Sequence, residues 1–270
     1  MDNQTYTSFE VRDKVAYITI NRPKVLNCLS PFVSWELSQH FDEVERNDGI
    51  WIAVVTGAGE KAFSAGMDLK FHQVMAQMCD EEMEDLAKKR EETRSFISRW
   101  YFPKPAIARV NGYAMGGGLE LALACDIVVA AEHAELGLPE PTRGLVAGAG
   151  GVHRLPRQIG LKAAMGYLLT GRHMPVRRAY ELGLVNDVVP YDKLDETVAG
   201  YIKDILACAP LSVRATKEMV MRGLDHPLHE AFEREYQWDK RRQSSPDAAE
   251  GPRAFAEKRK PNWTGEFADE

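Results

Sequence analysis

One stretch of the sequence constrains the fold of this chain more than any other. In it, three glycines lead into an apolar segment that contains one acid. Residues 111–126 read NGYAMGGGLELALACD, and Glu120 stands four residues after the first of the three glycines, Gly116. Burying an unpaired carboxylate is costly, and a partner or a shifted pKa normally compensates. Glu120 is therefore either a structural residue with a partner or an acid that is buried for use in chemistry.

The glycines predict a backbone that approaches a ligand or another chain segment closely. Gly116, Gly117 and Gly118 carry a conformational entropy cost, so they need a reason. The first N–H groups of a helix beginning here have no internal partner and lie at its positive end. They could bind a phosphate, or an oxygen that becomes negative only during reaction. The stretch matches neither a P-loop nor GxGxxG, and Glu120 would repel a phosphate, so the phosphate interpretation is the weaker one. A tight strand-to-helix turn is the structural alternative.

A second glycine segment and a second acid complete a candidate site. The stretch GEKAFSAGMDLK places Gly66 just before Met67, after another expected strand. Two N–H groups from two separate loops are what an oxyanion hole requires. Glu140 stands between two prolines, in an extended and rigid setting. By itself it could be a solvated loop acid, but two carboxylates beside such a hole can divide acid and base work.

Composition excludes several classes of protein. The chain has 270 residues and a formal net charge of −6, which argues against nucleic acid as the main partner. Hydrophobic residues make up 44% and charged residues 27%, as in a globular protein with a full core. The four cysteines have no metal-ligand spacing, so we expect free thiols in a reducing compartment, no metal, and Cys125 in the core. We see no signal peptide and no apolar stretch of membrane-spanning length, so we expect a cytoplasmic protein without membrane contact.

The order of expected elements indicates an α/β fold. Strands alternate with helices up to about residue 140, and the rest of the chain is almost entirely helical. Residues 9–23 predict a hairpin that turns at Asp13-Lys14, and Ser30-Pro31 predicts a helix start. Further helices are expected over residues 80–100, 161–170, 176–182, 192–207, 211–223 and 228–242. Phe255 and Trp263 in the polar tail indicate that the tail docks onto something.

With these residues in place, the chain resembles the crotonase (enoyl-CoA hydratase/isomerase) superfamily over nearly its whole length. The stretches that carry the resemblance, in chain order, are INRPKVLNCLS, VVTGAGEKAFSAGMDLK, KPAIARVNGYAMGGGLELALACDIVVAAE, LGLPEPTRGLVAGAGGVHRLPRQIG, LLTGRHMPVRRAYELGLVNDVVP and EGPRAFAEKRKPNW. Six such stretches in the same order make the resemblance specific.

The resemblance implies a fold and an assembly. The fold is a crotonase-like ββα spiral core over residues 1–195 that carries the active site. A helical C-terminal region over residues 196–270 would serve oligomerisation and close the pocket. The expected assembly is a homotrimer or a hexamer made of two trimers.

The resemblance also implies the chemistry of the site. The substrate is an acyl-CoA thioester, with no separate cofactor. Glu120 and Glu140 match the two glutamates of true hydratases, and Met67 and Gly117 match the residues whose N–H groups hold the thioester oxygen. Contacts to substrate and CoA are carried over onto Lys24, Val25, Leu26, Ala62, Ala65, Gly66, Asp68, Leu69 and Gly116.

An enoyl-CoA hydratase is the leading hypothesis, and several alternatives stay open. An isomerase could use Glu140 alone, and a hydratase-lyase would break a C–C bond of an aryl substrate. The stretches GAGGVHRLPRQIG and EGPRAFAEKRKPNW are similar to the branch that hydrates crotonobetainyl-CoA, which makes carnitinyl-CoA dehydratase a candidate. From other classes we consider a crotonase-like RNA-binding protein and a purely structural oligomer. The acidic balance speaks against the first of these, and the two glutamates speak against both.

Overall fold

The strands form two sheets, and between residues 52 and 137 consecutive strands alternate between them. The structure is a computed structural model that describes residues 5–267. The larger sheet has the order β1 (Thr7–Arg12), β2 (Val15–Ile20), β3 (Ile52–Gly57), β5 (Ala106–Val110), β7 (Ile127–Ala131) and β10 (Asp187–Val189). The smaller has the order β4 (Ala62–Ser64), β6 (Tyr113–Met115), β8 (Glu135–Gly137) and β9 (Met174–Pro175). Pairing is parallel except for β1 with β2 and β8 with β9.

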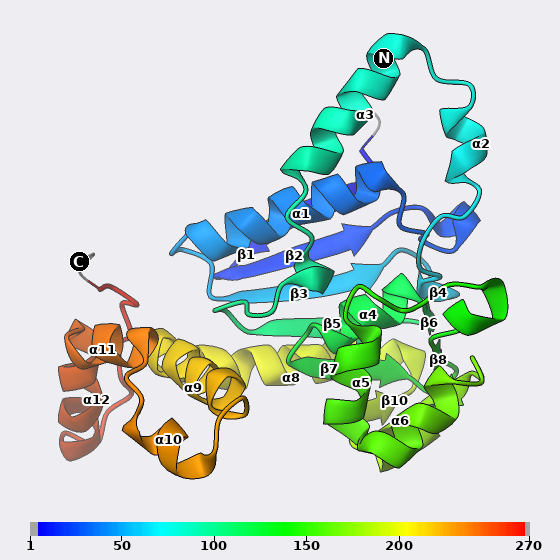
Figure 1. The fold of residues 1–270 in the computed structure, drawn as a ribbon. Coiled ribbons are helices and arrows are strands. Elements are labelled where there is room, and N and C mark those ends of the chain that lie inside the picture. Colours follow the sequence, from blue (N-terminus) through cyan, green and yellow to red (C-terminus); the bar gives the residue numbers. More distant parts are fainter. Residues whose placement is uncertain (1–4, 268–270) are drawn as a thin grey trace.

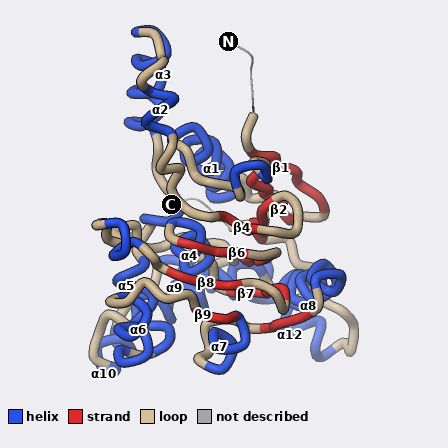
Figure 2. The backbone as a smooth tube through the Cα atoms, turned by 90° about the vertical axis from the view of Figure 1, so that its right-hand side faces the viewer, coloured by secondary structure: helices blue, strands red, loops and turns tan. Residues whose placement is uncertain are grey.

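The chain winds as a repeating unit of two strands. In each of the pairs β3–β4, β5–β6 and β7–β8, the first strand joins the larger sheet and the second joins the smaller one. Figure 2 shows β4, β6 and β8 side by side, with α4 next to them. Because these three strands are parallel, their carboxyl ends meet at one edge of the smaller sheet. The segments that follow them are therefore brought together, and they carry the candidate site residues.

Helices cover the sheets and then continue beyond them. They are α1 (Pro31–Arg46), α2 (Phe71–Met75), α3 (Asp80–Glu92), α4 (Gly117–Leu123), α5 (Gly151–Ile159), α6 (Leu161–Leu168), α7 (Val176–Glu181), α8 (Leu194–Leu206), α9 (Pro210–Gly223), α10 (Leu228–Glu233), α11 (Gln237–Gln243) and α12 (Pro246–Ala256). Single 3-10 turns are η1 (Pro23–Val25), η2 (Phe96–Ser98), η3 (Glu140–Arg143) and η4 (Tyr191–Lys193). The last helices, α9 to α12, gather at one end of the molecule, beyond the sheets (Figure 1). Within residues 5–267 no helix is long and apolar enough to cross a membrane.

The fold class and several local predictions are confirmed. Strands and helices alternate first, and a helical C-terminal region follows. The β1–β2 hairpin turns at Asp13 and Lys14, whose φ angles of 48° and 68° suit a tight hairpin turn. The Ser30 side chain accepts a hydrogen bond from the Val33 N–H at 3.4 Å and caps α1. All four cysteines are free thiols, and Cys125 is buried.

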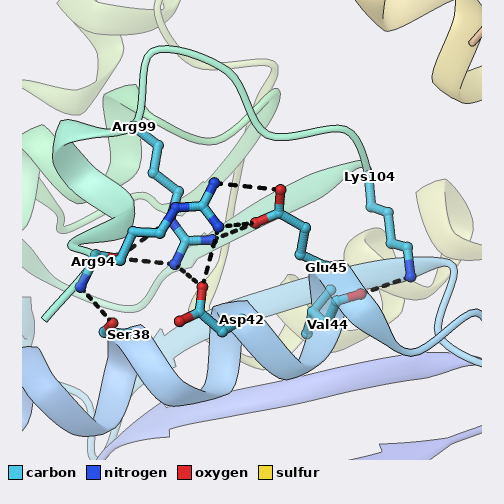
Figure 3. A network of polar contacts seen from close by, with 7 residues as sticks. All are labelled: Ser38, Asp42, Val44, Glu45, Arg94, Arg99 and Lys104. Atoms are coloured by element: carbon cyan, nitrogen blue, oxygen red, sulfur yellow. Dashed lines mark hydrogen bonds and ion pairs between the residues drawn. The ribbon is translucent and has the colours of Figure 1, made fainter. Parts of the chain in front are cut away.

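The prediction of one charged helix over residues 80–100 is wrong beyond Glu92. There the chain leaves the helix so that Phe96 can enter the core, where its ring stacks on Phe41 at 3.7 Å. Arg99 turns back to donate to Asp42 at 2.6 Å and to Glu45 at 2.9 Å on α1 (Figure 3). A continuous helix would hold these side chains away from α1, so tertiary contacts override the local helical pattern.

The same polar network includes a lysine whose ammonium group donates to two backbone carbonyl groups. Lys104 is fully buried, and its ammonium donates to the Val44 carbonyl at 2.6 Å (Figure 3). It also donates to the Asn47 carbonyl at 2.7 Å. Burial lowers the pKa of Lys104 to about 7. The two bonds satisfy carbonyl groups at the end of α1, where such groups have no partner within the helix.

The prediction of one helix over residues 228–242 is also wrong, because two short helices, α10 and α11, occupy it. Tyr236 between them is 5% exposed, and its hydroxyl donates to the Ala231 carbonyl at 3.0 Å. Burying this ring requires a bend that a single helix cannot make. The Trp238 N–H donates to the buried Glu218 carboxylate at 2.7 Å and fixes the new helix on α9.

The tail docks in part onto the chain's own helices. The Trp263 indole donates to the Ala207 carbonyl at 2.8 Å, and Asp247 accepts from the N–H groups of Thr264 and Gly265. Phe255, by contrast, is 87% exposed. The division at residues 195/196 stays a prediction. Helix α8 lies across it and packs Val198 on the larger sheet.

Candidate active site

Two glycine loops meet at the carboxyl ends of β4 and β6. Gly66 has a φ of +82°, and a Cβ atom there would lie 2.6 Å from the Met115 carbonyl oxygen and 2.8 Å from the Gly117 nitrogen. Only glycine satisfies both this backbone conformation and this spacing. The loop after β4 is therefore pressed directly against the loop that begins α4.

The N–H groups of Met67 and Gly117 lie close to one another at this contact. Leu29 donates to the Gly66 carbonyl at 2.8 Å and accepts from Asp68 at 3.1 Å, so the Met67 N–H between them points away from Leu29. Gly117 is the first residue of α4, where N–H groups have no partner within the helix. A Cβ atom on Gly117 would lie 3.7 Å from the Met67 nitrogen. Two such donors can stabilise an oxygen that gains negative charge.

The buried acid of the glycine segment has a backbone partner far along the chain. Glu120 lies on α4 and is 4% exposed, and its Oε1 accepts from the Gly151 N–H at 2.9 Å. Burial raises the pKa of Glu120, against the opposing effects of hydrogen bonds from Gly151 and Ala149 and of the Arg154 charge. The start of α5 thus supplies the donors that make a buried carboxylate tolerable.

The second acid leans over the first glycine of the run. Glu140 opens η3, and a Cβ atom on Gly116 would lie 2.9 Å from its Oε1. Its Oε2 is buried and has no hydrogen-bond partner within residues 5–267. Burial raises the pKa of Glu140, the Glu120 charge raises it further, and its own backbone N–H and Arg143 oppose this. The charge of Glu120 therefore opposes the ionisation of Glu140.

A cavity of about 750 Å³ opens beside these groups. Nine of the predicted site residues line it, namely Lys24, Val25, Leu26, Ala65, Met67, Asp68, Leu69, Gly116 and Glu140. Lys70, Arg143 and His173 add further basic side chains to its wall. The cavity is large enough for a long ligand that reaches Glu140, and its cations suit an anionic one.

Four predicted site residues do not line this cavity. Gly66 and Gly117 form the loop contact described above, and Glu120 is buried on α4. Ala62 is buried in β4, and its carbonyl accepts from the Asn27 and Asn111 side chains at 2.7 Å and 3.0 Å. Ala62 thus has a structural place in the smaller sheet, and its predicted contact with CoA stays a prediction.

One ion pair links two segments that line the cavity, and it was not predicted from the sequence. Arg22 forms an ion pair with Asp68 at 2.9 Å and donates to the Cys28 carbonyl at 2.7 Å. Asp68 follows Met67 directly, so the pair ties the loop that carries the Met67 N–H to residues 22–28. The sequence marks both loops, but nothing local indicates that these two charges, 46 residues apart, are partners.

Comparison with known proteins gives consistent matches over almost the full chain. Residues 10–266 match the family model described as enoyl-CoA hydratase/isomerase. The chain is 38% identical over 259 residues to (E)-benzylidenesuccinyl-CoA hydratase of Thauera aromatica, covering 96% of this chain and 98% of that one. It is 36% identical over 252 residues to carnitinyl-CoA dehydratase of Salmonella arizonae, covering 92% and 94%. A solved enoyl-CoA hydratase of Bacillus anthracis superposes with a TM-score of 0.85 at 37% identity, covering 97% and 100%.

Proposed function

The chain belongs to the enoyl-CoA hydratase/isomerase family, and we propose that it is an enoyl-CoA hydratase, a hydro-lyase that adds water reversibly to a 2,3-unsaturated acyl-CoA thioester. One observation carries the proposal. The buried carboxyl group of Glu120 and the half-buried one of Glu140, whose pKa the Glu120 charge raises, lie beside two N–H groups from neighbouring loops. An isomerase that only moves a proton needs one acid, whereas hydration uses two.

The N–H groups of Met67 and Gly117 take the thioester oxygen. Adding water across the double bond moves electron density onto that oxygen as an enolate. Two donors held in place by the loop contact stabilise the charge without reorganising. Losing one such donor typically raises the barrier by about 3–4 kcal/mol.

The two glutamates divide the transfer of the water molecule. Glu120, as a carboxylate, holds the water and takes one of its protons while the oxygen bonds to C3. Glu140 delivers a proton to C2, so that water is added in full. Burial raises the pKa of both acids. For Glu120 the N–H donors and Arg154 oppose this rise, whereas for Glu140 the Glu120 charge adds to it, and this difference supports the division.

The cavity takes the CoA part of the substrate. Lys24, Lys70 and Arg143 on its wall supply positive charge for phosphate groups, and Val25, Leu26 and Leu69 supply apolar surface. In this family, most of the remaining contacts to CoA are made by backbone groups. Ala65, Gly66 and Gly116 can make such contacts because they need no side chain. Asp68 acts here through Arg22 rather than through the ligand. The reaction so described runs without metal or redox chemistry.

The acyl group is a matter for experiment. A hydration assay should cover crotonyl-CoA, crotonobetainyl-CoA, feruloyl-CoA and (E)-benzylidenesuccinyl-CoA, followed by loss of the enoyl thioester absorbance. Rapid hydration of at least one of them supports the proposal. Double-bond migration without hydration would make the protein an isomerase, and C–C cleavage of feruloyl-CoA products would make it a hydratase-lyase.

The same assay separates the proposal from a non-enzymatic role. A crotonase-like RNA-binding protein would be retained on RNA in moderate salt and would turn over none of the thioesters. The net charge of −6 opposes that outcome.

We further propose a homotrimer, or a hexamer of two trimers, in the cytoplasm. The assembly rests on the helical C-terminal region, whose exposed apolar side chains include Phe232 and Phe255. The location rests on the four free cysteines, which suit a reducing compartment.

A further inference from the structure

We propose that Arg154 is a positioning residue for Glu120, fastening the turn at Gly150-Gly151 against residues 97–99 and placing a positive charge beside the Glu120 carboxylate. Arg154 does not line the cavity at Glu140. It acts on the reaction only through Glu120, so the inference rests on the role proposed for that acid.

The Arg154 guanidinium joins two parts of the chain that are distant in sequence. From α5 it donates through Nη1 to the Ile97 carbonyl at 2.5 Å and through Nη2 to the Arg99 carbonyl at 2.6 Å. A planar guanidinium makes two such bonds at once from a rigid fork, whereas an ammonium group acts from one point. The Arg154 side chain therefore holds η2 and the residue after it to α5.

The guanidinium lies directly over the turn that holds Glu120. A Cβ atom on Gly150 would lie 2.2 Å from Arg154 Nη1 and 3.4 Å from the Ile97 carbonyl oxygen. Gly150 has a φ of +129°, and its carbonyl accepts from the Arg154 N–H at 2.7 Å. The next residue, Gly151, donates to Glu120 Oε1 at 2.9 Å. Moving Arg154 would therefore move the donor that fixes the carboxylate.

The charge of Arg154 and its hydrogen bonds both favour the carboxylate form of Glu120. No carboxylate within residues 5–267 lies within 4.0 Å of its guanidinium in an ion pair. The titratable groups that act on it are Cys125 and Glu120, and Glu140 is the other acid that senses Glu120. Arg154 lowers the pKa of Glu120 against the larger effect of burial. Removing either the charge or the Gly151 bond would raise the pKa of Glu120.

Arg157 offers a matched control on the same helix. It lies one turn further along α5, is exposed, and donates to the His153 carbonyl at 2.8 Å. Arg154 and Arg157 both line a second cavity of about 730 Å³ between α4, α5 and α9. Only Arg154 contributes to the pKa of Glu120. Replacing either arginine by methionine therefore changes the net charge of α5 by the same amount. Only the replacement of Arg154 also removes the link to Glu120.

The test compares pH profiles of hydration for the parent, Arg154→Met, Arg154→Lys and Arg157→Met with the best thioester of the panel. We expect Arg154→Met to lower kcat about 10–100-fold and to move the ascending limb of the profile to higher pH by about 0.5–1 unit. KM should stay within about 3-fold, because CoA contacts are untouched. Arg154→Lys keeps the charge without the fork, so kcat should fall about 3–10-fold with the limb in place. Arg157→Met should match the parent.

A second readout requires no turnover. The ¹³C carboxyl titration of Glu120, assigned by its loss in Glu120→Gln, should shift to higher pH in Arg154→Met and stay in place in Arg157→Met. If the parent hydrates no thioester, the proposed function fails while this titration still decides the role of Arg154. The inference would be overturned if Arg154→Met matched Arg157→Met in three quantities. These are kcat, the pH of the ascending limb, and the carboxyl titration of Glu120. Should Arg154→Met fail to fold, a parental kcat in Arg154→Lys would overturn it.

Discussion

The inner strands of the larger sheet and the C-terminal helices differ in how completely each buries its apolar side chains. In the larger sheet, the inner strands β2, β3, β5 and β7 are almost fully buried, and polar groups such as Asn27 and Asn111 are bonded across loops. On α10 and α12, Phe232 and Phe255 are 82% and 87% exposed, and Leu224 beside α9 is 79% exposed. Large exposed apolar side chains in such numbers mark a contact surface. Figure 1 shows these helices gathered at one end of the molecule.

The difference assigns separate tasks to the two regions. The residues proposed for chemistry, from Met67 to Glu140, lie on the loop after β4, on α4 and on η3, which the two sheets hold in place. The C-terminal helices are anchored to the strand-containing core by contacts such as Lys217 with Asp126 at 2.6 Å, yet they leave apolar surface uncovered. The core can therefore hold a site by itself, while the helices complete their burial only against another surface. Changes in the two regions should have effects of very different size and kind.

The largest expected effect comes from removing one backbone donor in the core. Gly117→Pro deletes the N–H that we assign to the thioester oxygen, so turnover should fall about 1,000-fold in steady-state assays. Gly117→Ala is the control, since it keeps the N–H and its Cβ meets nothing nearer than Leu29 Cδ1 at 3.4 Å. A folded Gly117→Pro variant with near-normal turnover would show that the hole is elsewhere.

Next in size are the two acids. Glu120→Gln and Glu140→Gln should each lower hydration at least about 100-fold, because the amide keeps the shape but cannot exchange a proton. CoA thioesters should still bind. The double variant should be little worse than the worse single one, since the two groups act as a unit.

The two acids should also be distinguishable from each other. Exchange of the C2 proton with solvent deuterium, followed by NMR, should depend mainly on Glu140, while water addition needs both. If Glu140→Gln hydrated every thioester at the rate of the parent, the proposed mechanism would be wrong. Glu140 would then be a solvated loop acid.

A smaller effect is expected from the ion pair that supports the Met67 loop. Asp68→Asn removes the charge that meets Arg22, so the Met67 N–H should be held less firmly and kcat should fall about 3–10-fold. The absorbance of a bound cinnamoyl-type thioester should shift less to the red than in the parent, since its carbonyl is less polarised. Glu10→Gln, which breaks an exposed pair with Arg12, is the control and should change neither quantity.

The smallest effect on chemistry is expected at the C-terminal end. Phe232→Ser combined with Phe255→Ser should lower the assembly mass measured by light scattering, while turnover per subunit changes within about 2-fold. The parent should be a trimer or hexamer, whereas a parent of about 30 kDa would contradict the assembly. Glu233→Gln on α10 is the control for solubility. A loss of activity together with the loss of assembly would mean that the core does not hold the site alone.

Local patterns in the sequence determined the elements and the site's components. Asp13-Lys14 between two β-rich runs specified the hairpin, and Ser30-Pro31 specified the start of α1. The three glycines and the acid in an apolar run were enough to indicate α4 and to single out Glu120. These signals act between residues a few positions apart, where backbone conformation and capping are decided. They are therefore visible in the sequence itself.

Only the tertiary structure decided which groups satisfy one another. The end of α3 at Glu92, the bend at Tyr236 and the partner of Asp68 all follow from contacts made across long separations. Glu120 is the plainest case, since its partner Gly151 stands 31 residues later. A buried polar group must find a donor wherever the chain is packed against it, and that packing depends on all the sheets and helices at once.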